Sequence, residues 1–173
     1  MTRNLWLTVV LCFAATPALA TPTECVLPQP VQAALGDKWS GWRLLQLADL
    51  RSDDQTLWRD HPLNGKPCPG MNQGKFDGLR TGFLFTLVRE SEEQVVIVAT
   101  PSGDSFTITV LAKPMKVPYF SVVNVVPPGK YKDFYTGRAT QIRADSAAIE
   151  AIEANITLFY FDGGRWKSLV ISD

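Results

Sequence analysis

Histidine is almost missing from this sequence of 173 residues, which contains one, His61. A Ser-His-Asp or Cys-His mechanism needs an imidazole as its base, but His61 precedes Pro62 in a loop-like stretch and is read as an exposed loop residue. The patterns Gly-x-x-x-x-Gly-Lys, Gly-x-Gly-x-x-Gly and Gly-x-Ser-x-Gly do not occur. The sequence therefore predicts no cofactor, no metal site and no conventional catalytic residues.

An excess of one charge is also missing, because 17 basic side chains face 17 acidic ones. A balanced charge gives no strong attraction to nucleic acid or to an anionic membrane, so neither is expected as a partner. Outside the extreme N-terminus no apolar run reaches the roughly 18 residues that span a bilayer. The length and the hydrophobic fraction of 46% are typical of one ordinary globular domain.

The N-terminus has the three parts of a secretory signal. Arg3 supplies a positive charge, residues 5–15 form an apolar core, and Ala18-Leu19-Ala20 gives the small-x-small cleavage pattern. We therefore expect residues 1–20 to be a signal peptide that is removed and residues 21–41 to be an N-terminal lead-in. Residues 42–173 are then expected to form a single antiparallel β domain. Export to the periplasm is the expectation, with the extracellular space as the alternative.

Of the three cysteines, Cys25 and Cys68 lie beyond the signal. In an oxidising compartment two cysteines most simply form one disulfide. It would close a loop of about 44 residues and stabilise the fold by about 4 kcal/mol in the chain-entropy model. A redox-active or metal-binding pair is the alternative, but Cys-x-x-Cys spacing is absent. We expect a structural disulfide.

Short apolar or alternating segments, separated by turn residues, dominate the chain after Leu79. Turns, rather than helical crossovers, join them, which favours antiparallel pairing. The prediction is a mainly β (α+β) fold, a single antiparallel sheet domain of about six to eight strands with one or two short helices. Strands are expected at residues 42–47, 82–89, 94–100, 105–111, 119–126, 156–161 and 165–171, helices at 31–35 and around 53–59, and a loop at 61–74, while 146–153 fits helix or strand.

Carboxylates occur in three groups that could do acid–base chemistry. They are Asp53, Asp54 and Asp60; Glu90, Glu92 and Glu93; and Glu150 and Glu153. Each group has a simpler explanation as a helix cap, a solvated turn or a surface face. A carboxylate-dependent cell-wall hydrolase stays an alternative, and it would need two carboxyl groups roughly 5 to 9.5 Å apart across a cleft.

Two short motifs, Cys68-Pro69-Gly70 and Phe76-Asp77-Gly78, resemble those of a group of uncharacterised secreted bacterial proteins. The Phe-Asp-Gly loop of that group is similar to the calcium-binding turn of FG-GAP/VCBS-type β-propeller repeats. Residues 128–133 and 160–173 fit the same group, so the resemblance runs loosely from about Trp42 to the C-terminus. It implies a β-rich fold and no particular activity.

The Phe-Asp-Gly loop departs from the calcium pattern. Calcium needs several oxygen ligands from alternate positions, but here those positions hold Lys75, Asp77 and Leu79, and Arg80 follows. We therefore expect no calcium site. Asp77 and Gly78 are expected to form a structural turn, in which the carboxylate bonds its own backbone and the preceding phenylalanine enters the core.

The remaining signal for function is a segment rich in tyrosine. Tyr, Trp and Arg are enriched at binding hot spots, and Tyr131, Asp133, Tyr135 and Arg138 lie together in it. Core and surface are both open for this segment, and we predict these four residues as a contact surface. The tryptophans Trp42, Trp58 and Trp166 are instead expected in the core.

The leading hypothesis is an exported, non-catalytic binding protein. Its most concrete form is an inhibitor or immunity-type protein that neutralises a toxin or envelope enzyme by protein–protein contact. Besides the hydrolase, the alternative is a small-ligand sensor of the envelope, in which Trp side chains line an open pocket of roughly a few hundred Å³.

Overall fold

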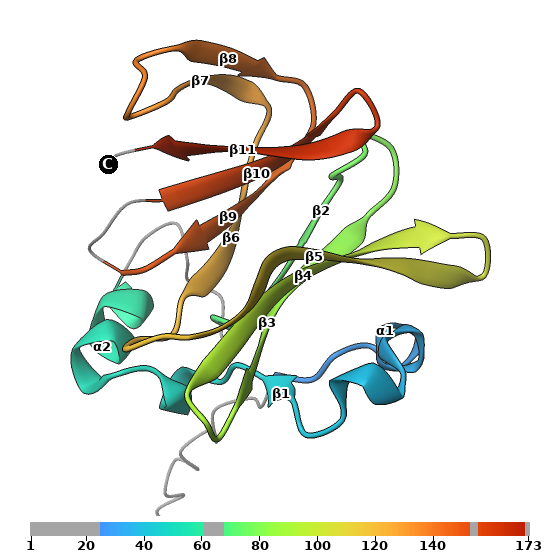
Figure 1. Cartoon of the computed structure of the whole chain (residues 1–173), viewed down its shortest axis with the longest axis vertical. Helices are drawn as coiled ribbons and strands as arrows, with labels where there is room; N and C mark the ends of the chain where they lie inside the picture. The colour runs from blue at the N-terminus through green and yellow to red at the C-terminus, as the bar shows by residue number, and fades with distance from the viewer. Residues whose placement is uncertain (1–24, 61–67, 153–155, 172–173) are drawn as a thin grey trace, which may run out of the picture.

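The structure is a computed structural model that describes residues 25–60, 68–152 and 156–171 (Figure 1). In this part of the chain eleven strands and two α-helices form, so the mainly β class is confirmed. The strands belong to three antiparallel sheets, whereas one sheet of fewer strands was expected. The difference arises because several strands are short and pair with segments distant in the sequence, which local pattern does not reveal.

The elements follow one another along the chain with short connections. Their bounds are α1 Gln29–Leu35, the 3₁₀-helices η1 Asp37–Trp39 and η2 Leu47–Asp49, β1 Arg43–Leu44, α2 Ser52–Asp60, β2 Met71–Gly74, β3 Gly82–Arg89, β4 Glu93–Ser102, β5 Ser105–Lys116, β6 Val122–Val126, β7 Gly129–Lys132, β8 Ala139–Ile142, β9 Ser146–Glu150, β10 Ile156–Asp162 and β11 Arg165–Ile171.

The first sheet has the order β1-β3-β4-β5, and β2 also pairs with β3. Its central strands are buried on both faces, because Phe85 and Ile97 pack toward α1 while Leu84 and Val98 pack toward the second sheet. Burial on both faces explains why β3 and β4 are continuous apolar runs and not alternating ones.

The second sheet has the order β11-β10-β9-β6. One of its faces packs on the first sheet through a core that includes Val123 and Ala147. Its other face is covered by the β7–β8 hairpin, where Tyr131 packs with Leu158 and Leu169. The helical segment around α1, the first sheet, the second sheet and the hairpin therefore lie in successive layers (Figure 1).

The segment that fitted helix or strand is strand β9. It pairs with β6 on one side and β10 on the other, and its small residues Ala147 and Ala148 are buried, one on each face of the sheet. Two-sided pairing outweighs the modest helix preference of an Ala- and Glu-rich sequence.

The prediction of a loop at residues 61–74 is wrong at its C-terminal end. Residues 61–67, with His61, lie outside the described part, but β2 (Met71–Gly74) pairs with β3. Just before it, Gly70 lies so close to the chain that an added Cβ would be 2.3 Å from the carbonyl oxygen of Leu45. Glycine here serves close backbone packing, although composition alone suggested a loop.

Two other strands are shorter than expected. β1 covers residues 43–44 and not 42–47, because η2 begins at Leu47, and β6 begins at Val122 and not at Tyr119. Tyr119 is exposed, with the guanidinium of Arg51 over its ring at 3.9 Å. The β10–β11 hairpin joins the two C-terminal strands that the sequence predicts, and its turn is Gly163-Gly164.

The tryptophans divide between buried and half-buried positions. Trp58 of α2 is buried and packs with Leu45 and Leu50. Trp42 and Trp166 are half-buried at the margins of two core clusters. No helix in the described part of the chain is long and apolar enough to cross a membrane.

Most buried polar side chains in the core are hydrogen-bonded. The amide of Gln94 accepts from the Ser121 backbone N–H at 2.8 Å and donates to the Ser121 hydroxyl at 3.2 Å. The hydroxyl of Thr86 donates to the Ser121 carbonyl at 3.3 Å. Among the described residues Ser146 Oγ is the exception, since it is buried without a partner.

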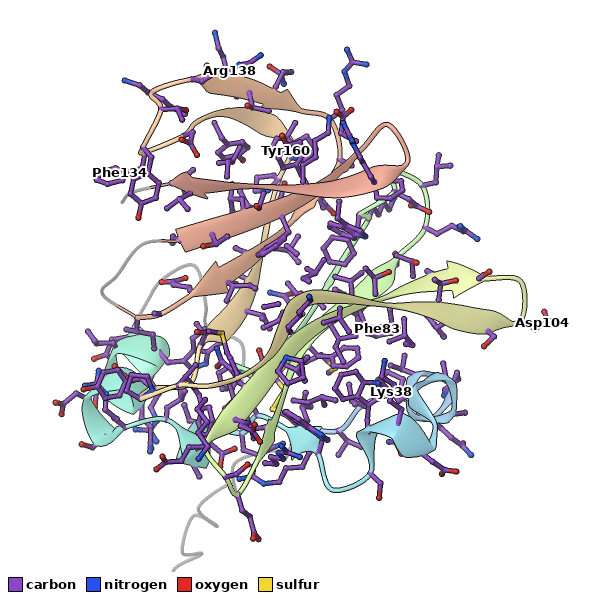
Figure 2. The ribbon with its side chains drawn as sticks, viewed as in Figure 1. Lys38, Phe83, Asp104, Phe134, Arg138 and Tyr160 are labelled. Atoms are coloured by element: carbon purple, nitrogen blue, oxygen red, sulfur yellow. A yellow bond between two sulfur atoms is a disulfide. The ribbon has the colours of Figure 1, made fainter. Side chains whose placement is uncertain are left out.

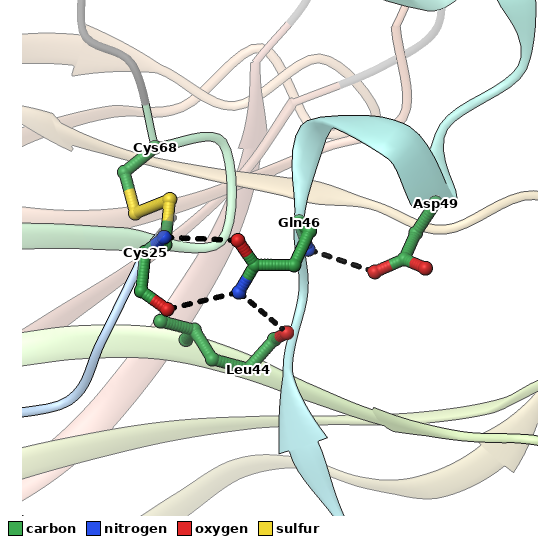
Figure 3. Close-up of a disulfide and its surroundings, with 5 residues drawn as sticks. All are labelled: Cys25, Leu44, Gln46, Asp49 and Cys68. Atoms are coloured by element: carbon green, nitrogen blue, oxygen red, sulfur yellow. Dashed lines mark hydrogen bonds between the residues drawn. A yellow bond between two sulfur atoms is a disulfide. The ribbon is translucent and has the colours of Figure 1, made fainter. Parts of the chain in front are cut away.

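A disulfide joins Cys25 to Cys68, with a Cα–Cα distance of 5.6 Å, as predicted (Figure 3). Beside it, Gln46 clamps the N-terminal segment. Its Oε1 accepts from the Cys25 N–H at 2.9 Å, and its Nε2 donates to the carbonyls of Cys25 at 2.9 Å and Leu44 at 3.1 Å. The bond and the clamp together attach this segment to the first sheet.

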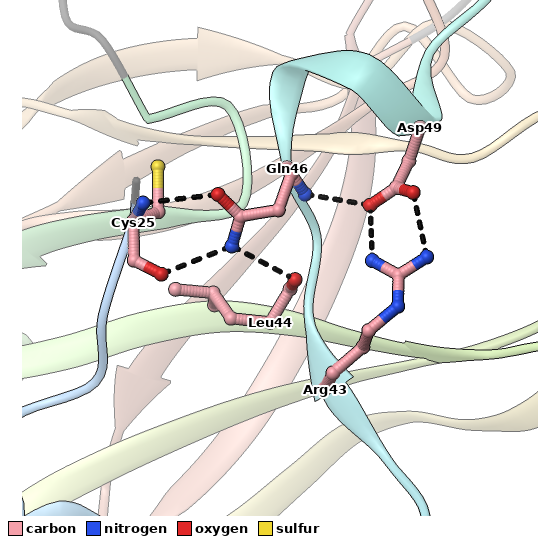
Figure 4. A network of polar contacts seen from close by, with 5 residues as sticks. All are labelled: Cys25, Arg43, Leu44, Gln46 and Asp49. Atoms are coloured by element: carbon pink, nitrogen blue, oxygen red, sulfur yellow. Dashed lines mark hydrogen bonds and ion pairs between the residues drawn. The ribbon is translucent and has the colours of Figure 1, made fainter. Parts of the chain in front are cut away.

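The clamp is itself held by an ion pair (Figure 4). Asp49 accepts from the Gln46 backbone N–H at 2.8 Å and from both terminal nitrogens of Arg43, at 2.5 and 2.6 Å. Burial alone would raise the pKa of Asp49, but the bonds from Arg43 and Gln46 outweigh it, so the pKa lies below its usual value.

Candidate functional site

The predicted contact segment forms the end of the β7–β8 hairpin, and Asp133 organises its turn. Asp133 Oδ1 accepts from the backbone N–H and from the hydroxyl of Thr136, both at 2.8 Å. The backbone closes the turn from Asp133 N–H to the Arg138 carbonyl and from Gly137 N–H to the Asp133 carbonyl, each at 2.9 Å. The bonds from Thr136, and one from Val170, lower the pKa of Asp133.

The same turn is attached to strand β11 of the second sheet. The Phe134 N–H donates to the Val170 carbonyl at 2.7 Å, and the Val170 N–H donates to Asp133 Oδ2 at 3.2 Å. The turn is thus held both within the hairpin and against a neighbouring sheet. A turn tied at both places is preorganised and loses little conformational freedom when it binds.

Two aromatic rings project from this turn. Phe134 is 54% exposed and Tyr135 is 71% exposed, and their ring centroids lie 5.3 Å apart in an edge-to-face arrangement. Figure 2 shows Phe134 at the turn end of the hairpin, pointing away from the sheets. We call these two residues the aromatic tip. An adjacent pair of aromatic side chains in water is a typical hot-spot feature.

Of the four predicted contact residues, two lie at the surface and two are engaged inside the protein. Tyr135 and Arg138 are exposed. Tyr131 is half-buried among the residues beneath the hairpin, its hydroxyl donates to the Pro127 carbonyl at 2.6 Å, and burial raises its pKa. Both carboxylate oxygens of Asp133 accept hydrogen bonds from the turn and from β11. Both therefore position the tip instead of offering groups to a partner.

Sequence reasoning missed Phe134, which lies between two residues that it identified. A signal was present: a large apolar residue between Asp133 and Gly137, both typical of turns, is placed where it cannot reach a core. The hairpin turn, and not the alternation of a strand, decides the direction of this ring.

Basic side chains lie on the same hairpin as the aromatic tip. Lys130, Lys132 and Arg138 are exposed on the hairpin, whereas Asp133 is its only acidic residue between 129 and 142. Within the described part of the chain the Arg138 side chain has no hydrogen bond or ion pair, and Figure 2 shows it at the outer edge of the hairpin. The hairpin therefore combines an apolar tip with a local positive charge that the balanced total hides.

The Phe-Asp-Gly segment forms a tight turn. Asp77 Oδ1 accepts from the backbone N–H groups of Leu79 and Arg80, both at 2.8 Å, and Gly78 has a φ of +78°. Those bonds, the Arg80 N–H first among them, lower the pKa of Asp77. Phe76 is 1% exposed.

The carboxylates of interest are mostly held in ion pairs or turned to solvent. Asp54 pairs with Arg51 at 2.9 Å, and Glu93 pairs with Arg89. Asp53, Asp60, Glu90 and Glu92 are exposed, Glu150 is half-buried, and Glu153 lies outside the described residues. Over residues 25–60, 68–152 and 156–171, no three His, Cys, Asp or Glu side chains are placed to hold a metal ion.

Comparisons of the chain with protein-family models, curated proteins and solved structures found no match. The resemblance to secreted proteins with a Phe-Asp-Gly loop therefore stays a prediction.

Proposed function

We propose that this protein is an exported, non-catalytic binding protein that holds a protein partner with its β7–β8 hairpin. The main support for the proposal is that Phe134 and Tyr135 are exposed on a turn whose conformation is fixed by hydrogen bonds within the turn and to β11. Two large rings held in water have a free-energy cost that a partner surface would relieve.

The size of this effect follows from the exposed fractions. Rings of this type have about 200 Å² of surface each, so 54% and 71% exposure leaves about 250 Å² to bury. At about 25 cal/mol per Å² this supplies about 6 kcal/mol before the cost of association. That is enough to make the tip the energetic centre of a standard interface.

The positive charge of the hairpin favours a partner with an acidic surface. Lys130, Lys132 and Arg138 favour an acidic surface, because they outnumber the one carboxylate of the hairpin, Asp133. A partner surface with an apolar pocket and an acidic rim would complement this hairpin. The concrete form of the proposal is an inhibitor or immunity-type protein acting on a toxin or envelope enzyme.

The proposed location is the periplasm. The Cys25–Cys68 disulfide is consistent with an oxidising compartment. The hydrogen bonds of Gln46 beside the disulfide fix the N-terminal segment, which adds to the rigidity that a preorganised binding protein needs.

The test is affinity capture with residues 21–173, disulfide intact, from envelope and secreted fractions of cells that produce the protein. Three baits are compared: the natural sequence, the double variant Phe134→Ser/Tyr135→Ser, and Tyr119→Ser as a matched control. Tyr119 is also an exposed tyrosine, at 53%, but lies beside α2.

We expect one stoichiometric protein to be retained by the natural sequence and by Tyr119→Ser, and to be lost with the double variant. Near-ultraviolet circular dichroism checks that all three baits are folded. Retention of the same protein by all three baits, or no retained protein with any of them, would contradict the proposal.

A further inference from the structure

A second feature, distant from the hairpin tip, is a groove between the two large sheets. Its walls are the β4–β5 hairpin, the β10–β11 hairpin and the turn from Phe76 to Arg80, and its volume is about 380 Å³. This volume lies in the range of small-molecule sites. The proposed function makes no use of this groove.

One wall of the groove is aromatic. The Trp166 ring is braced on one side by Phe76, at a centroid distance of 6.1 Å, and on another by Phe161, at 5.7 Å. Trp166 is half-buried, while Phe161 is 39% exposed. Packing thus fixes the indole ring in place, and part of it still lies open to the groove.

The facing wall is lined with hydroxyl groups. Thr100 and Ser102 of β4 and Thr107 and Thr109 of β5 line the groove, and Thr100 pairs directly with Thr107 across the strands. None of these hydroxyls has a hydrogen-bond partner within the described part of the chain. The opposite face of β5 packs into the core, so strand alternation directs this row of threonines into the groove.

One cationic side chain, that of Arg80, is part of the groove lining. Arg80 donates through Nε to Asp77 at 3.3 Å, and no other bond of its guanidinium to the described residues is found. The oxygens of Asp77 are already used by the turn and by this contact. The outer edge of the Arg80 guanidinium therefore has two nitrogens to offer an anionic group.

We infer that this groove binds a pyranose sugar that carries a carboxylate. The C–H face of the ring would lie on Trp166, its hydroxyls would exchange hydrogen bonds with the threonine row, and its carboxylate would meet Arg80. Hydroxyls suit such a ligand because each can donate and accept. A flat apolar ligand would instead cover the threonine hydroxyls and leave them unpaired, which is unfavourable.

Another cavity is larger but does not show the same pattern. It has a volume of about 510 Å³ and is lined by Trp39, Trp42 and the clamp region. There, Gln46 is used by the N-terminal segment, and Arg43 is used by Asp49. Because Gln46 and Arg43 already have partners, they offer a ligand less than the unpaired hydroxyls of the groove do.

The inference is tested by NMR titration of the disulfide-intact chain of residues 21–173, following the indole N–H resonance of Trp166. The probes are D-glucuronate, D-glucose and acetate. We expect a saturable shift with glucuronate and a dissociation constant of about 1 mM, as for a ligand of so few atoms. Glucose should bind about 10-fold more weakly, because it lacks the charge-assisted bond, and acetate should not shift this resonance.

Variants separate the roles of the two polar features. The pair Thr107→Val/Thr109→Val keeps the side-chain shape and should weaken both sugars about 10-fold. Arg80→Gln should lower glucuronate affinity to that of glucose and leave glucose binding unchanged. Thr140→Val, on the β7–β8 hairpin, and Arg165→Gln, beside the groove but not in its lining, are the matched controls.

Three results would overturn the inference. They are the absence of a saturable Trp166 shift with either sugar, a shift with acetate equal to that with glucuronate, and unchanged affinity in both groove variants. The double variant of the aromatic tip, Phe134→Ser/Tyr135→Ser, should bind glucuronate normally, so the groove and the proposed protein partner are tested independently.

Discussion

Removal of the disulfide should destabilise this protein strongly without changing its fold. The variant is Cys25→Ala/Cys68→Ala, in which alanine avoids placing new hydroxyl groups at buried or half-buried positions. The bond joins residues 43 positions apart, and the loop it closes includes α1, β1 and α2. Opening this loop gives the unfolded chain more freedom, which favours unfolding.

The expected magnitude comes from the length of the loop. A closed loop of about 44 residues corresponds to about 4 kcal/mol at 25 °C. Domains typically have only about 5–15 kcal/mol of stability, so the loss is a large fraction of the total. With a urea dependence of about 2 kcal/mol per molar, the midpoint of unfolding should fall by about 2 M.

The assay is urea unfolding at equilibrium, followed by tryptophan fluorescence. Gln46→Ala is measured in both backgrounds, because its side chain holds the same segment at Cys25. With the disulfide present, we expect this change to cost about 1–3 kcal/mol. In the Cys25→Ala/Cys68→Ala variant, Gln46→Ala should lower the free energy of unfolding by less. Without the disulfide the N-terminal segment can detach, and its backbone groups can then form hydrogen bonds with water. Equal midpoints with and without the disulfide would show that closing this loop does not stabilise the fold.

Five further variants test buried hydroxyl groups, close backbone packing and the ion pair of Asp49. Ser146→Ala should keep or raise the free energy of unfolding, because it removes a buried hydroxyl without a partner, whereas Thr86→Val should lower it by about 1 kcal/mol. Gly70→Ala should lower the free energy of unfolding by about 3 kcal/mol or more, because the added Cβ would clash with Leu45. Gly103→Ala should lower it by only about 1 kcal/mol, because its site is open and only its positive φ is unfavourable for alanine. Thermal unfolding compares the two variants. The pKa of Asp49 is lowered in the folded protein, so the carboxylate stabilises the fold above about pH 4 and this stabilisation is lost on acidification. Asp49→Asn should therefore be less stable at pH 7. In urea titrations at a series of pH values, its free energy of unfolding should fall less steeply toward acid pH.

Much of the fold could be predicted from local sequence. The alternation of Phe106 and Ile108 with Thr107 and Thr109 predicts a strand with two different faces, and β5 has them. The Gly163-Gly164 turn between apolar runs predicts the β10–β11 hairpin. These signals are local, because a turn and its two flanking strands are close in the sequence.

The division of the strands into three sheets, and the existence of strand β2, could not be predicted from local sequence. β2 includes polar Asn72, which lies buried and donates to Asn124 at 3.3 Å, 52 positions away. Only the distant partner makes a strand of this segment. The helix-like composition of β9 was misleading for a related reason, since its two neighbours in the sheet decide its structure.

The candidate site was predicted in part. The tyrosine-rich segment directed attention to the correct hairpin, but sequence could not separate Tyr135, which faces water, from Tyr131, which packs inward. Nor could it place Trp166 opposite the threonine row, since that groove is formed by two hairpins about 60 positions apart in the chain.

The most direct test of the account is site-specific photo-crosslinking in cells that produce the protein. A benzophenone amino acid replaces Tyr135 at the aromatic tip or, as the matched control, Tyr119, an exposed tyrosine at 53%. If the tip holds a protein partner, light should join one protein to position 135 and none to position 119. Adducts of equal yield from both positions, or from position 119 alone, would contradict the account.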